Sequence, residues 1–199
     1  MRIGWDFDEP IFKWFDAAHN ACLDAGLADP EMPYPTKWAP YEEYGCTKEE
    51  WVAVIDRQVM RGSRGFYGSP IDPEAVALLK RLDSLGYENH IVTARGQFGT
   101  LGPVIKTLTR EQVYRAGIPH ESLTFTKEKG EVAAYLGLDY FIDDSLPNFW
   151  DVLGAGVDTF LLDCPWNRDD EIVVPEGRRL ASAEEYVNLI IDRHGDVRG

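Results

Sequence analysis

Short apolar segments alternate with amphipathic stretches along most of the chain, and this rhythm restricts the fold more than any other feature. The apolar segments are rich in β-branched or aromatic residues, as the buried strands of parallel sheets are. They lie at residues 2–7, 88–93, 122–126, 139–143 and 158–162. Strands that alternate with helices predict an α/β protein, with a Rossmann-like parallel sheet and helices on both of its faces.

Helix signals fill the intervals between these segments. Thr47 and Ser182 each begin a capping box, and Pro73 follows Asp72 at a first helical position. Gly26 ends the first helical pattern. The apolar spacing predicts helices near residues 11–25, 47–59, 72–85, 103–116 and 128–136, and the capping box at Ser182 predicts a further helix towards the C-terminus.

One region breaks the rhythm. Residues 13–69 contain no clear central strand, but they hold helical patterns, a Pro- and Tyr-rich stretch (30–44) and a Gly-rich stretch (62–68). A region of this length is too long for a plain connection between a strand and a helix. We therefore expect an α/β core of residues 1–12 and 70–199, with residues 13–69 forming a small helical cap inserted after the first strand.

Charge and cysteine content restrict the partners. The chain has 20 Lys and Arg against 34 Asp and Glu, a formal charge of −14, so its surface should repel polynucleotides. Cys22, Cys46 and Cys164 are far apart in the sequence, which argues against a disulfide framework or a structural zinc site. There is no signal-peptide pattern and no apolar run of membrane-spanning length. We expect a cytoplasmic monomer or homodimer without polynucleotide or membrane partners.

Polar side chains gather at the carboxyl ends of four predicted strands. In an open parallel sheet, this edge is where ligands bind. Along the chain these residues are Asp6 and Asp8, then Thr93 and Arg95 with the small Ala94 between them, then Lys127 and Lys129, and finally Asp143 and Asp144.

The paired carboxylates point to a cation. Side chains at positions i and i+2 of an extended chain point the same way, so Asp6 and Asp8 should lie close together. Close carboxylates repel each other and require a cation or a shared proton. Because Asp143 and Asp144 form a second pair, a cation is the better explanation, and hard oxygen ligands suit Mg²⁺. Magnesium suits a substrate that carries phosphate, whose charge the other strand ends could stabilise.

Each signal alone has an ordinary structural explanation. An Asp-x-Asp triplet is usually a turn or a cap, and an Asp-Asp pair often caps a helix. Lysines in the first turn of a helix are commonly surface charges, although the helix dipole slightly disfavours them there. The succession of all four motifs on consecutive strand ends is what indicates a functional site.

These motifs resemble those of the haloacid dehalogenase superfamily of phosphatases. The resemblance lies in Asp6-Phe7-Asp8, in residues 91–95, in Lys129 and in residues 141–145. The long insert after the first motif is similar to the helical cap of that superfamily. Residues 161–167 and 38–51 are similar to the 5'(3')-deoxyribonucleotidase branch.

The resemblance implies roles for the acidic residues. Asp6 would be the nucleophile that forms an aspartyl-phosphate, and Asp8 would be the general acid and then the general base. The Mg²⁺ ligands would come from the side chain of Asp6, the backbone carbonyl of Asp8 and the acidic pair. Asp144 would be the direct ligand, with Asp143 close by.

The resemblance also implies a phosphate-binding set. Thr93 and Lys129 would hold the transferring phosphoryl group, with Ala94 and Arg95 in the same motif. Lys127 is an alternative to Lys129, whose distance before the acidic pair is the usual one.

Two residues depart from the pattern. Glu9 replaces the usual Gly after the second Asp, and Pro10 replaces the usual Thr or Val. Glu9 adds negative charge beside the site, so reduced activity is one expectation for this chain.

The insert should select the substrate. Aromatic faces accept nucleobases, and loop aromatics are the better candidates for this role. Phe12 and Phe15 fall on the apolar face of their helix and should pack in the core. The candidates for contact with the substrate are Trp38, Arg64, Phe66 and Tyr67.

The sequence thus predicts a Mg²⁺-dependent phosphomonoester hydrolase, a phosphatase of the nucleotidase type that acts on a small phosphorylated substrate. A phosphatase of another small metabolite and a catalytically dead relative that binds a nucleotide or a partner are alternatives. A signalling receiver domain has similar residue types, but its acidic pair comes first and its lysine last.

Overall fold

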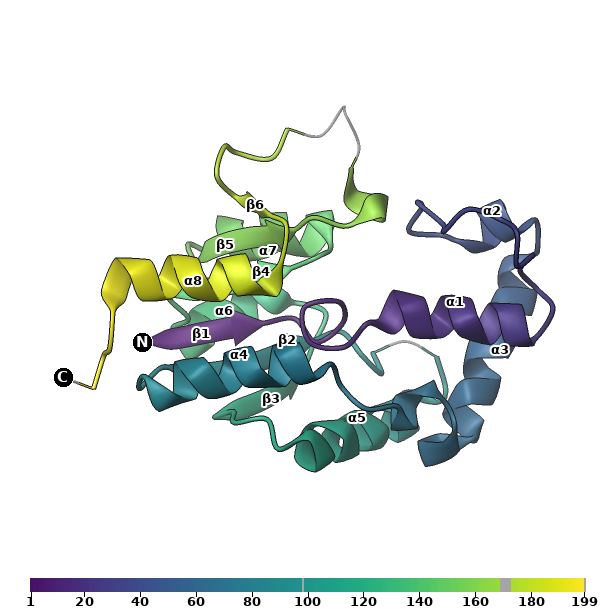
Figure 1. Ribbon diagram of the computed structural model, residues 1–199, viewed down its shortest axis with the longest axis horizontal. Coiled ribbons are helices and arrows are strands. Elements are labelled where there is room, and N and C mark those ends of the chain that lie inside the picture. Colours follow the sequence, from purple (N-terminus) through teal and green to yellow (C-terminus); the bar gives the residue numbers. More distant parts are fainter. Residues whose placement is uncertain (98, 169–172, 199) are drawn as a thin grey trace.

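Residues 1–97, 99–168 and 173–198 are described by the computed structural model, and within them six parallel strands form one sheet. The strand order is β3-β2-β1-β4-β5-β6 (Figure 1). The strands are β1 (Arg2–Trp5), β2 (Glu88–Thr93), β3 (Ser122–Phe125), β4 (Tyr140–Asp143), β5 (Asp158–Leu162) and β6 (Arg179–Leu180). This arrangement confirms the predicted parallel α/β sheet.

The predicted strands match those of the sheet closely, except that β1 is shorter than predicted and β6 was not predicted. β2 and β5 begin and end where the apolar segments do. β1 stops at Trp5, before the predicted end, because the chain turns: the amides of Ile11 and Phe12 both donate to the carbonyl of Phe7. β6 was not predicted, because two residues carry no readable periodicity.

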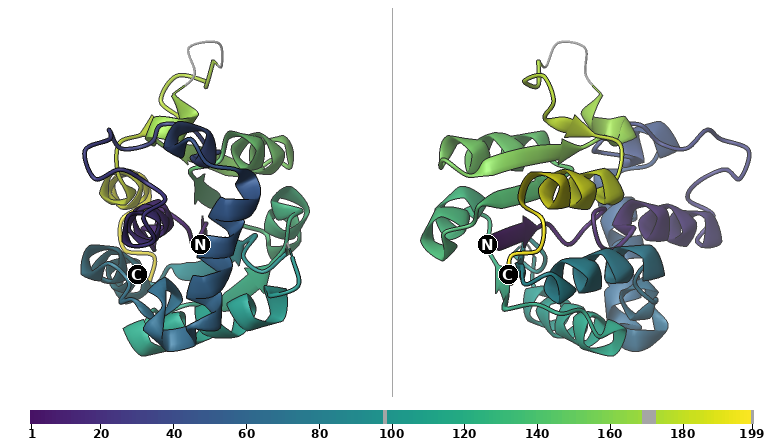
Figure 2. Two further views of the ribbon diagram at one scale, coloured as in Figure 1. Left: turned by 90° about the vertical axis from the view of Figure 1, so that its right-hand side faces the viewer. Right: turned by 60° about the vertical axis from the view of Figure 1, so that its left-hand side comes forward.

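Helices cover both faces of the sheet (Figure 2). They are α1 (Trp14–Asp24), α2 (Tyr41–Tyr44), α3 (Lys48–Met60), α4 (Pro73–Ser84), α5 (Gly102–Ala116), α6 (Lys129–Leu136), α7 (Leu146–Gly154) and α8 (Ala183–His194), with 3-10 turns η1 (Gly62–Arg64), η2 (Phe66–Gly68) and η3 (Pro165–Asn167). The hydroxyls of Thr47 and Ser182 accept the capping hydrogen bonds expected at the starts of α3 and α8. The sequence did not predict α7, although Pro147 in its first turn was an available signal.

The core has two parts, one on each face of the sheet. Ile91 and Val92 are consecutive in β2 and belong to different clusters, because successive side chains of a strand point to opposite faces. The larger cluster includes residues of α4, α5 and α8, and the smaller one includes residues of α6 and α7. Burial of this kind contributes about 1.5–3 kcal/mol for each large apolar side chain.

The segment between β1 and α4 lies beyond the carboxyl ends of the strands (Figure 1). Its described residues, 13–69, form α1, α2, α3, η1 and η2 and contain no strand. α1 packs against α3, and η2 packs against α5 of the sheet domain. The insert is thereby held over the edge where the polar residues were expected.

The strand order distinguishes this fold from that of a signalling receiver domain. A receiver domain of the flavodoxin-like type has the order 2-1-3-4-5, whereas here β1 lies between β2 and β4. The receiver interpretation is therefore excluded. The chain order reverses beside β1, so the crevice at the carboxyl ends of β1 and β4 is the expected ligand site.

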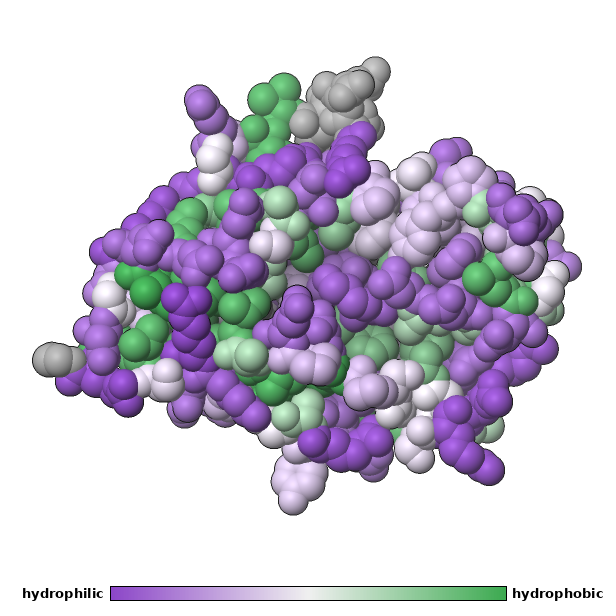
Figure 3. Space-filling view, viewed as in Figure 1, coloured by the Kyte–Doolittle hydropathy of each residue, from purple (hydrophilic) through white to green (hydrophobic). Residues whose placement is uncertain are grey.

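The surface agrees with the acidic composition. Hydrophilic residues cover most of the face viewed in Figure 1, interrupted by small apolar patches (Figure 3). Among the described helices, none combines the length and the apolar character that crossing a membrane requires.

Candidate active site

The carboxyl ends of β1 and β4 bring three buried carboxylates together. Because Trp5 pairs with Ile142, the next residues, Asp6 just after β1 and Asp143 at the end of β4, lie side by side. Oxygens of Asp6, Asp143 and Asp144 lie within 4.8 Å of one another, and no more than 5% of any of the three residues is exposed. We call these three residues the acidic cluster.

One lysine reaches into the acidic cluster. Nζ of Lys129, the first residue of α6, lies 2.7 Å from Asp6 Oδ1 and 2.6 Å from Asp143 Oδ2. Burial alone lowers the pKa of this ammonium, but Asp143 and Asp6 together raise its pKa above the ordinary value. Lys129 therefore stays charged, and its ammonium lies among the carboxylates of the acidic cluster.

The two members of the acidic pair have different surroundings. Both oxygens of Asp143 accept hydrogen bonds: Oδ2 from Lys129, and Oδ1 from the amide of Ser145 at 2.8 Å and from Asn148 at 3.2 Å. Asp144 accepts a bond only at Oδ2 among the described residues, from the indole of Trp166 at 2.8 Å. Its Oδ1 therefore remains open to a cation, a distinction that sequence spacing could not make.

The acidic cluster fits a hard divalent cation. Burial raises the pKa of Asp144 well above its ordinary value, and the charges of Asp143 and Asp6 raise it further. Burial also raises the pKa of Asp6, against the opposing effect of Lys129. One ammonium faces three carboxylates, and oxygen ligands of this kind suit Mg²⁺.

Asp8 lies at the edge of the same crevice and is paired with Arg95. Arg95 Nη2 lies 2.5 Å from Asp8 Oδ1, and Nε lies 2.9 Å from the same oxygen. The sequence assigned Arg95 to the phosphate-binding set, but each of its three side-chain nitrogens already donates to an acceptor on the protein. The structure thus directs this guanidinium toward Asp8.

Thr93 and Ala94 line a cavity of about 560 Å³, together with Asp6, Asp8 and Lys129. Thr93 is 1% exposed, and its hydroxyl accepts a hydrogen bond from the amide of Arg95 at 3.2 Å. Residues from the ends of β1, β2 and β4 and from the start of α6 therefore meet in one space, as expected for an open parallel sheet.

Glu9 has an unusual backbone conformation. Its φ of 70° is the only positive value for a non-glycine among the described residues, which explains why glycine suits this position. The side chain turns back, and Oε1 accepts a hydrogen bond from the amide of Phe15 at 2.8 Å at the start of α1. Burial raises the pKa of Glu9 to about 7. Glu9 therefore connects the turn after β1 to the first helix of the insert.

Aromatic side chains form the other side of the cavity. We call them the aromatic wall: Trp14, Phe15, Trp38, Trp51, Tyr67 and Trp166. All but Trp166 come from the insert. The rings of Phe15 and Trp166 stack with centroids 4.2 Å apart, and those of Trp14 and Trp51 meet edge to face at 6.2 Å. Phe15 is buried, as expected of a core residue, and it also lines the cavity.

The four candidates for substrate contact divide into two groups. Trp38, 62% exposed, and Tyr67 line the cavity. Phe66 lies outside the cavity lining and packs on Trp14 and Tyr67. Arg64 is exposed and is likewise outside the lining.

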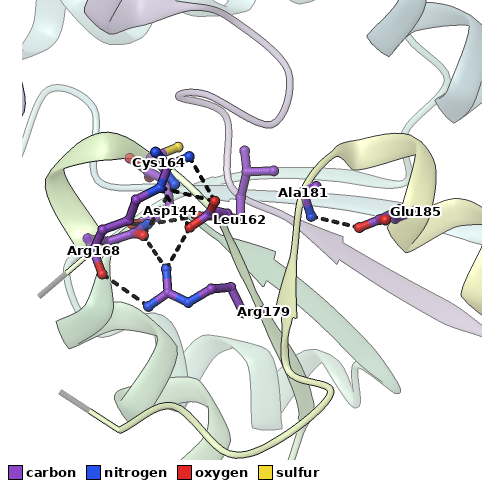
Figure 4. A network of polar contacts seen from close by, with 9 residues as sticks. Asp144, Leu162, Cys164, Arg168, Arg179, Ala181 and Glu185 are labelled. Atoms are coloured by element: carbon purple, nitrogen blue, oxygen red, sulfur yellow. Dashed lines mark hydrogen bonds and ion pairs between the residues drawn. The ribbon is translucent and has the colours of Figure 1, made fainter. Parts of the chain in front are cut away.

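The loop after β5 supports Asp144, a role the sequence did not reveal. Trp166 holds Oδ2, and Nδ2 of Asn167 donates to the backbone carbonyl of Asp144 at 2.7 Å. Arg179 extends toward this loop and donates to Asn167 Oδ1 at 2.6 Å (Figure 4). The only sequence signal was the resemblance over residues 161–167, which assigned no role to these side chains.

Comparison with solved structures agrees with this fold. A protein of Streptococcus pneumoniae, a hydrolase of the haloacid dehalogenase-like family, superposes with a TM-score of 0.63 at 13% identity over 95% of this chain and 97% of its own. A protein described as a dehalogenase superposes with a TM-score of 0.59 at 12% identity over 94% of this chain and 96% of its own. The chain has the haloacid dehalogenase fold. The fold resemblance predicted from the motifs is confirmed.

Sequence similarity to known proteins is weaker than structural similarity. No family model matches the chain. A protein of Chlorobaculum tepidum named "Putative 5'(3')-deoxyribonucleotidase" is 26% identical over 160 residues, which span 80% of this chain and 74% of that protein. Similarity to these proteins is thus clear in the fold and weak in the sequence.

Proposed function

We propose that the protein is a Mg²⁺-dependent phosphomonoester hydrolase that acts on nucleoside monophosphates. One observation carries the proposal: Asp6, Asp8, Thr93, Lys129 and Asp144 all line one cavity at the carboxyl edge of the sheet. The cavity thus brings together the proposed nucleophile, the proposed general acid, hydrogen-bond donors for the phosphoryl oxygens and cation ligands.

Asp6 is the proposed nucleophile. Its Oδ1 is bonded to Lys129, which leaves Oδ2 to attack phosphorus. A bond forms between Oδ2 and phosphorus as the bond from phosphorus to the ester oxygen breaks, and Asp8 donates the proton that this oxygen needs. Thr93 and Lys129 donate to the phosphoryl oxygens. A water then attacks the aspartyl-phosphate, Asp8 takes its proton, and inorganic phosphate and free Asp6 result.

The acidic cluster is the proposed magnesium site. Asp6 and Asp144 would hold the ion through their side chains, and Asp8 through its backbone carbonyl. When bound, Mg²⁺ neutralises charge on the phosphoryl oxygens. Asp143 keeps Lys129 and the start of α7 in place through the hydrogen bonds of both its oxygens.

The charges of the cavity favour a substrate with a single phosphate. Among the described lining residues the cations are Arg95 and Lys129, and both are paired with carboxylates. Asp56 adds a further negative charge to the lining. A second phosphate on the substrate would meet no unpaired cation there, so we expect mononucleotides to be preferred over diphosphates.

The aromatic wall favours a planar group on the other end of the substrate. Aromatic faces stack on nucleobases with little dependence on the base. The Chlorobaculum tepidum relative, whose name includes deoxyribonucleotidase, supports a nucleotide over a sugar phosphate. We further propose that residues 13–69 act as a cap that supplies this wall, and that the protein works in the cytoplasm, in keeping with its three free cysteines.

Phosphate release from a panel of substrates tests the proposal. The panel contains ribo- and deoxyribonucleoside monophosphates, nucleoside diphosphates and sugar phosphates, each with Mg²⁺ and with a chelator. We expect turnover of monophosphates that the chelator and Asp6→Asn both abolish, while the exposed Asp83→Asn control keeps full activity.

Two results would count against the proposal. Turnover that persists in Asp6→Asn would remove Asp6 as the nucleophile. If folded wild-type protein releases no phosphate from any substrate, the chain is a binding protein, and calorimetry with the same nucleotides would then identify the ligand.

A further inference from the structure

Arg95 is almost fully buried beside the carboxylate of Asp8, in the wall of the cavity. Its Nε is 2.9 Å from Oδ1 and 3.1 Å from Oδ2, and its Nη2 is 2.5 Å from Oδ1. The Arg95 side chain is 3% exposed, whereas that of Asp8 is 28% exposed. The ion pair therefore has one buried side, the guanidinium, and one side that opens to the cavity.

We infer that Arg95 is a positioning residue that fixes Asp8 in the orientation from which it protonates the leaving group. The inference rests on the proposed phosphatase function and goes beyond it, because it assigns the orientation of the acid to a residue that the sequence had grouped with the phosphate-binding set. A fork of two parallel hydrogen bonds fixes the plane of a carboxylate, which a single bond does not.

The two oxygens of Asp8 are left in different states. Oδ1 accepts hydrogen bonds from both Nη2 and Nε of Arg95. Oδ2 receives only the longer contact from Nε. Oδ2 is consequently the oxygen that is able to carry a proton to the ester oxygen of a bound substrate.

Arg95 is itself held firmly from two elements. Its Nη1 donates to Gln112 Oε1 at 3.0 Å and to Thr109 Oγ1 at 3.3 Å, both on α5. The guanidinium carbon lies 4.3 Å from the ring centre of Phe7 and 4.8 Å from that of Phe12. Such contacts restrict a guanidinium that is already planar, so it holds its partner with little further loss of freedom.

Two other roles for Arg95 make different predictions. A phosphate anchor would need nitrogens free for the substrate, and its loss would raise KM for every phosphate ester alike. A purely structural ion pair would, when removed, lower the melting temperature and reduce all rates by one common factor. A positioning residue affects only substrates whose leaving group needs a proton.

The test uses that difference between leaving groups. p-Nitrophenyl phosphate releases a stabilised phenolate that needs little protonation, whereas a nucleoside monophosphate releases an alkoxide that needs a proton. Release of each leaving group is followed in a single turnover, which isolates the first step. The proteins are wild type, Arg95→Met, Arg95→Lys, Asp8→Asn, the double variant of Arg95→Met and Asp8→Asn, and the exposed Arg57→Met as control.

We expect Arg95→Met to slow nucleoside release by about 100-fold or more, the range a general acid supplies, and nitrophenolate release by less than about tenfold. Asp8→Asn should show the same selectivity, and the double variant should be no slower than Asp8→Asn alone. Arg95→Lys keeps the charge but not the fork, so it should lie between wild type and Arg95→Met.

A second variant covers the case in which Arg95→Met does not fold. Thr109→Val combined with Gln112→Leu removes the supports of Nη1 and leaves Arg95 and Asp8 in place. It should slow nucleoside release by about tenfold and leave nitrophenolate release nearly unchanged. Equal slowing of both substrates, or an effect on KM alone, would overturn the inference. Wild-type protein that releases neither leaving group would instead refute the proposed function itself, and the inference with it.

Discussion

The acidic cluster and the aromatic wall line the same cavity, but they are held together in different ways. Each carboxylate of the cluster has a partner within hydrogen-bonding distance, which is Lys129 for Asp6 and Asp143 and Trp166 for Asp144. The wall is made of rings that contact one another, and its outermost member, Trp38, is 62% exposed. Chemistry needs fixed charges, whereas selection of a substrate tolerates adaptable apolar contacts. The two sides should therefore respond differently to substitution.

The largest effect is expected on removal of the Lys129 ammonium that lies against the acidic cluster. Lys129→Met leaves Asp6 and Asp143 buried without a positive partner, and breaking a buried pair in this way typically costs about 3–5 kcal/mol. We expect the free energy of unfolding in urea to fall by that amount, and the exposed Lys48→Met control to change it little. Adding Asp143→Asn should recover part of the loss. A loss under about 1 kcal/mol would mean that the cluster does not depend on this pairing.

Glu9 lies between the two regions and should make stability depend on pH. Its folded pKa of about 7 exceeds the ordinary 4.5, so the folded state binds its proton more tightly than the unfolded state. The stabilisation is complete below pH 4.5 and is lost as the pH rises through about 7. At about pH 8 the charged carboxylate costs up to about 3 kcal/mol.

Glu9→Gln removes this charge and leaves the backbone conformation unchanged. In urea titrations with a chelator, we expect the variant to be more stable than wild type at about pH 8 and almost equal to it at about pH 4.5. The exposed Glu111→Gln should show no such difference. Parallel pH profiles for wild type and Glu9→Gln would contradict the raised pKa.

Trp166 belongs to both regions, since its ring stacks on Phe15 and its indole N–H holds Asp144. Trp166→Phe keeps a ring and loses the N–H. Residues that support a metal ligand typically contribute 10–100-fold to metal affinity, so we expect Mg²⁺ binding to weaken by about tenfold or more in calorimetry. Trp150→Phe, at an exposed tryptophan outside the cavity, is the matched control. Unchanged Mg²⁺ affinity would mean that the hydrogen bond from Trp166 does not contribute to metal binding by the acidic cluster.

Trp38 should show the smallest effect, confined to recognition. Loss of one stacking contact costs about 1 kcal/mol, so Trp38→Ala should raise KM for nucleoside monophosphates roughly fivefold and leave kcat unchanged. Sugar phosphates, which have no base, should be unaffected, and Trp150→Ala should change neither substrate. A fall in kcat would mean that the wall takes part in the chemistry.

Local sequence patterns determined most of the architecture. The apolar runs at β2 and β5 and the caps at Thr47 and Ser182 are encoded within short windows, so the sequence predicted them directly. The same windows identified the polar strand ends, because the residue that follows a strand is fixed by where the strand stops. β6 and α7 escaped prediction because one is too short to show a period and the other begins directly after a motif.

What each charge touches was decided only by the tertiary structure. Arg95 was grouped with phosphate ligands by its position, yet it contacts Asp8, 87 positions away. Asp143 and Asp144 are indistinguishable in sequence. In the structure, Lys129 and Ser145 donate hydrogen bonds to the two oxygens of Asp143, whereas Trp166 donates to one oxygen of Asp144 and leaves the other open. The sequence sets which side chains leave the sheet at its carboxyl edge. Their partners come from distant segments, and packing alone brings those segments into contact.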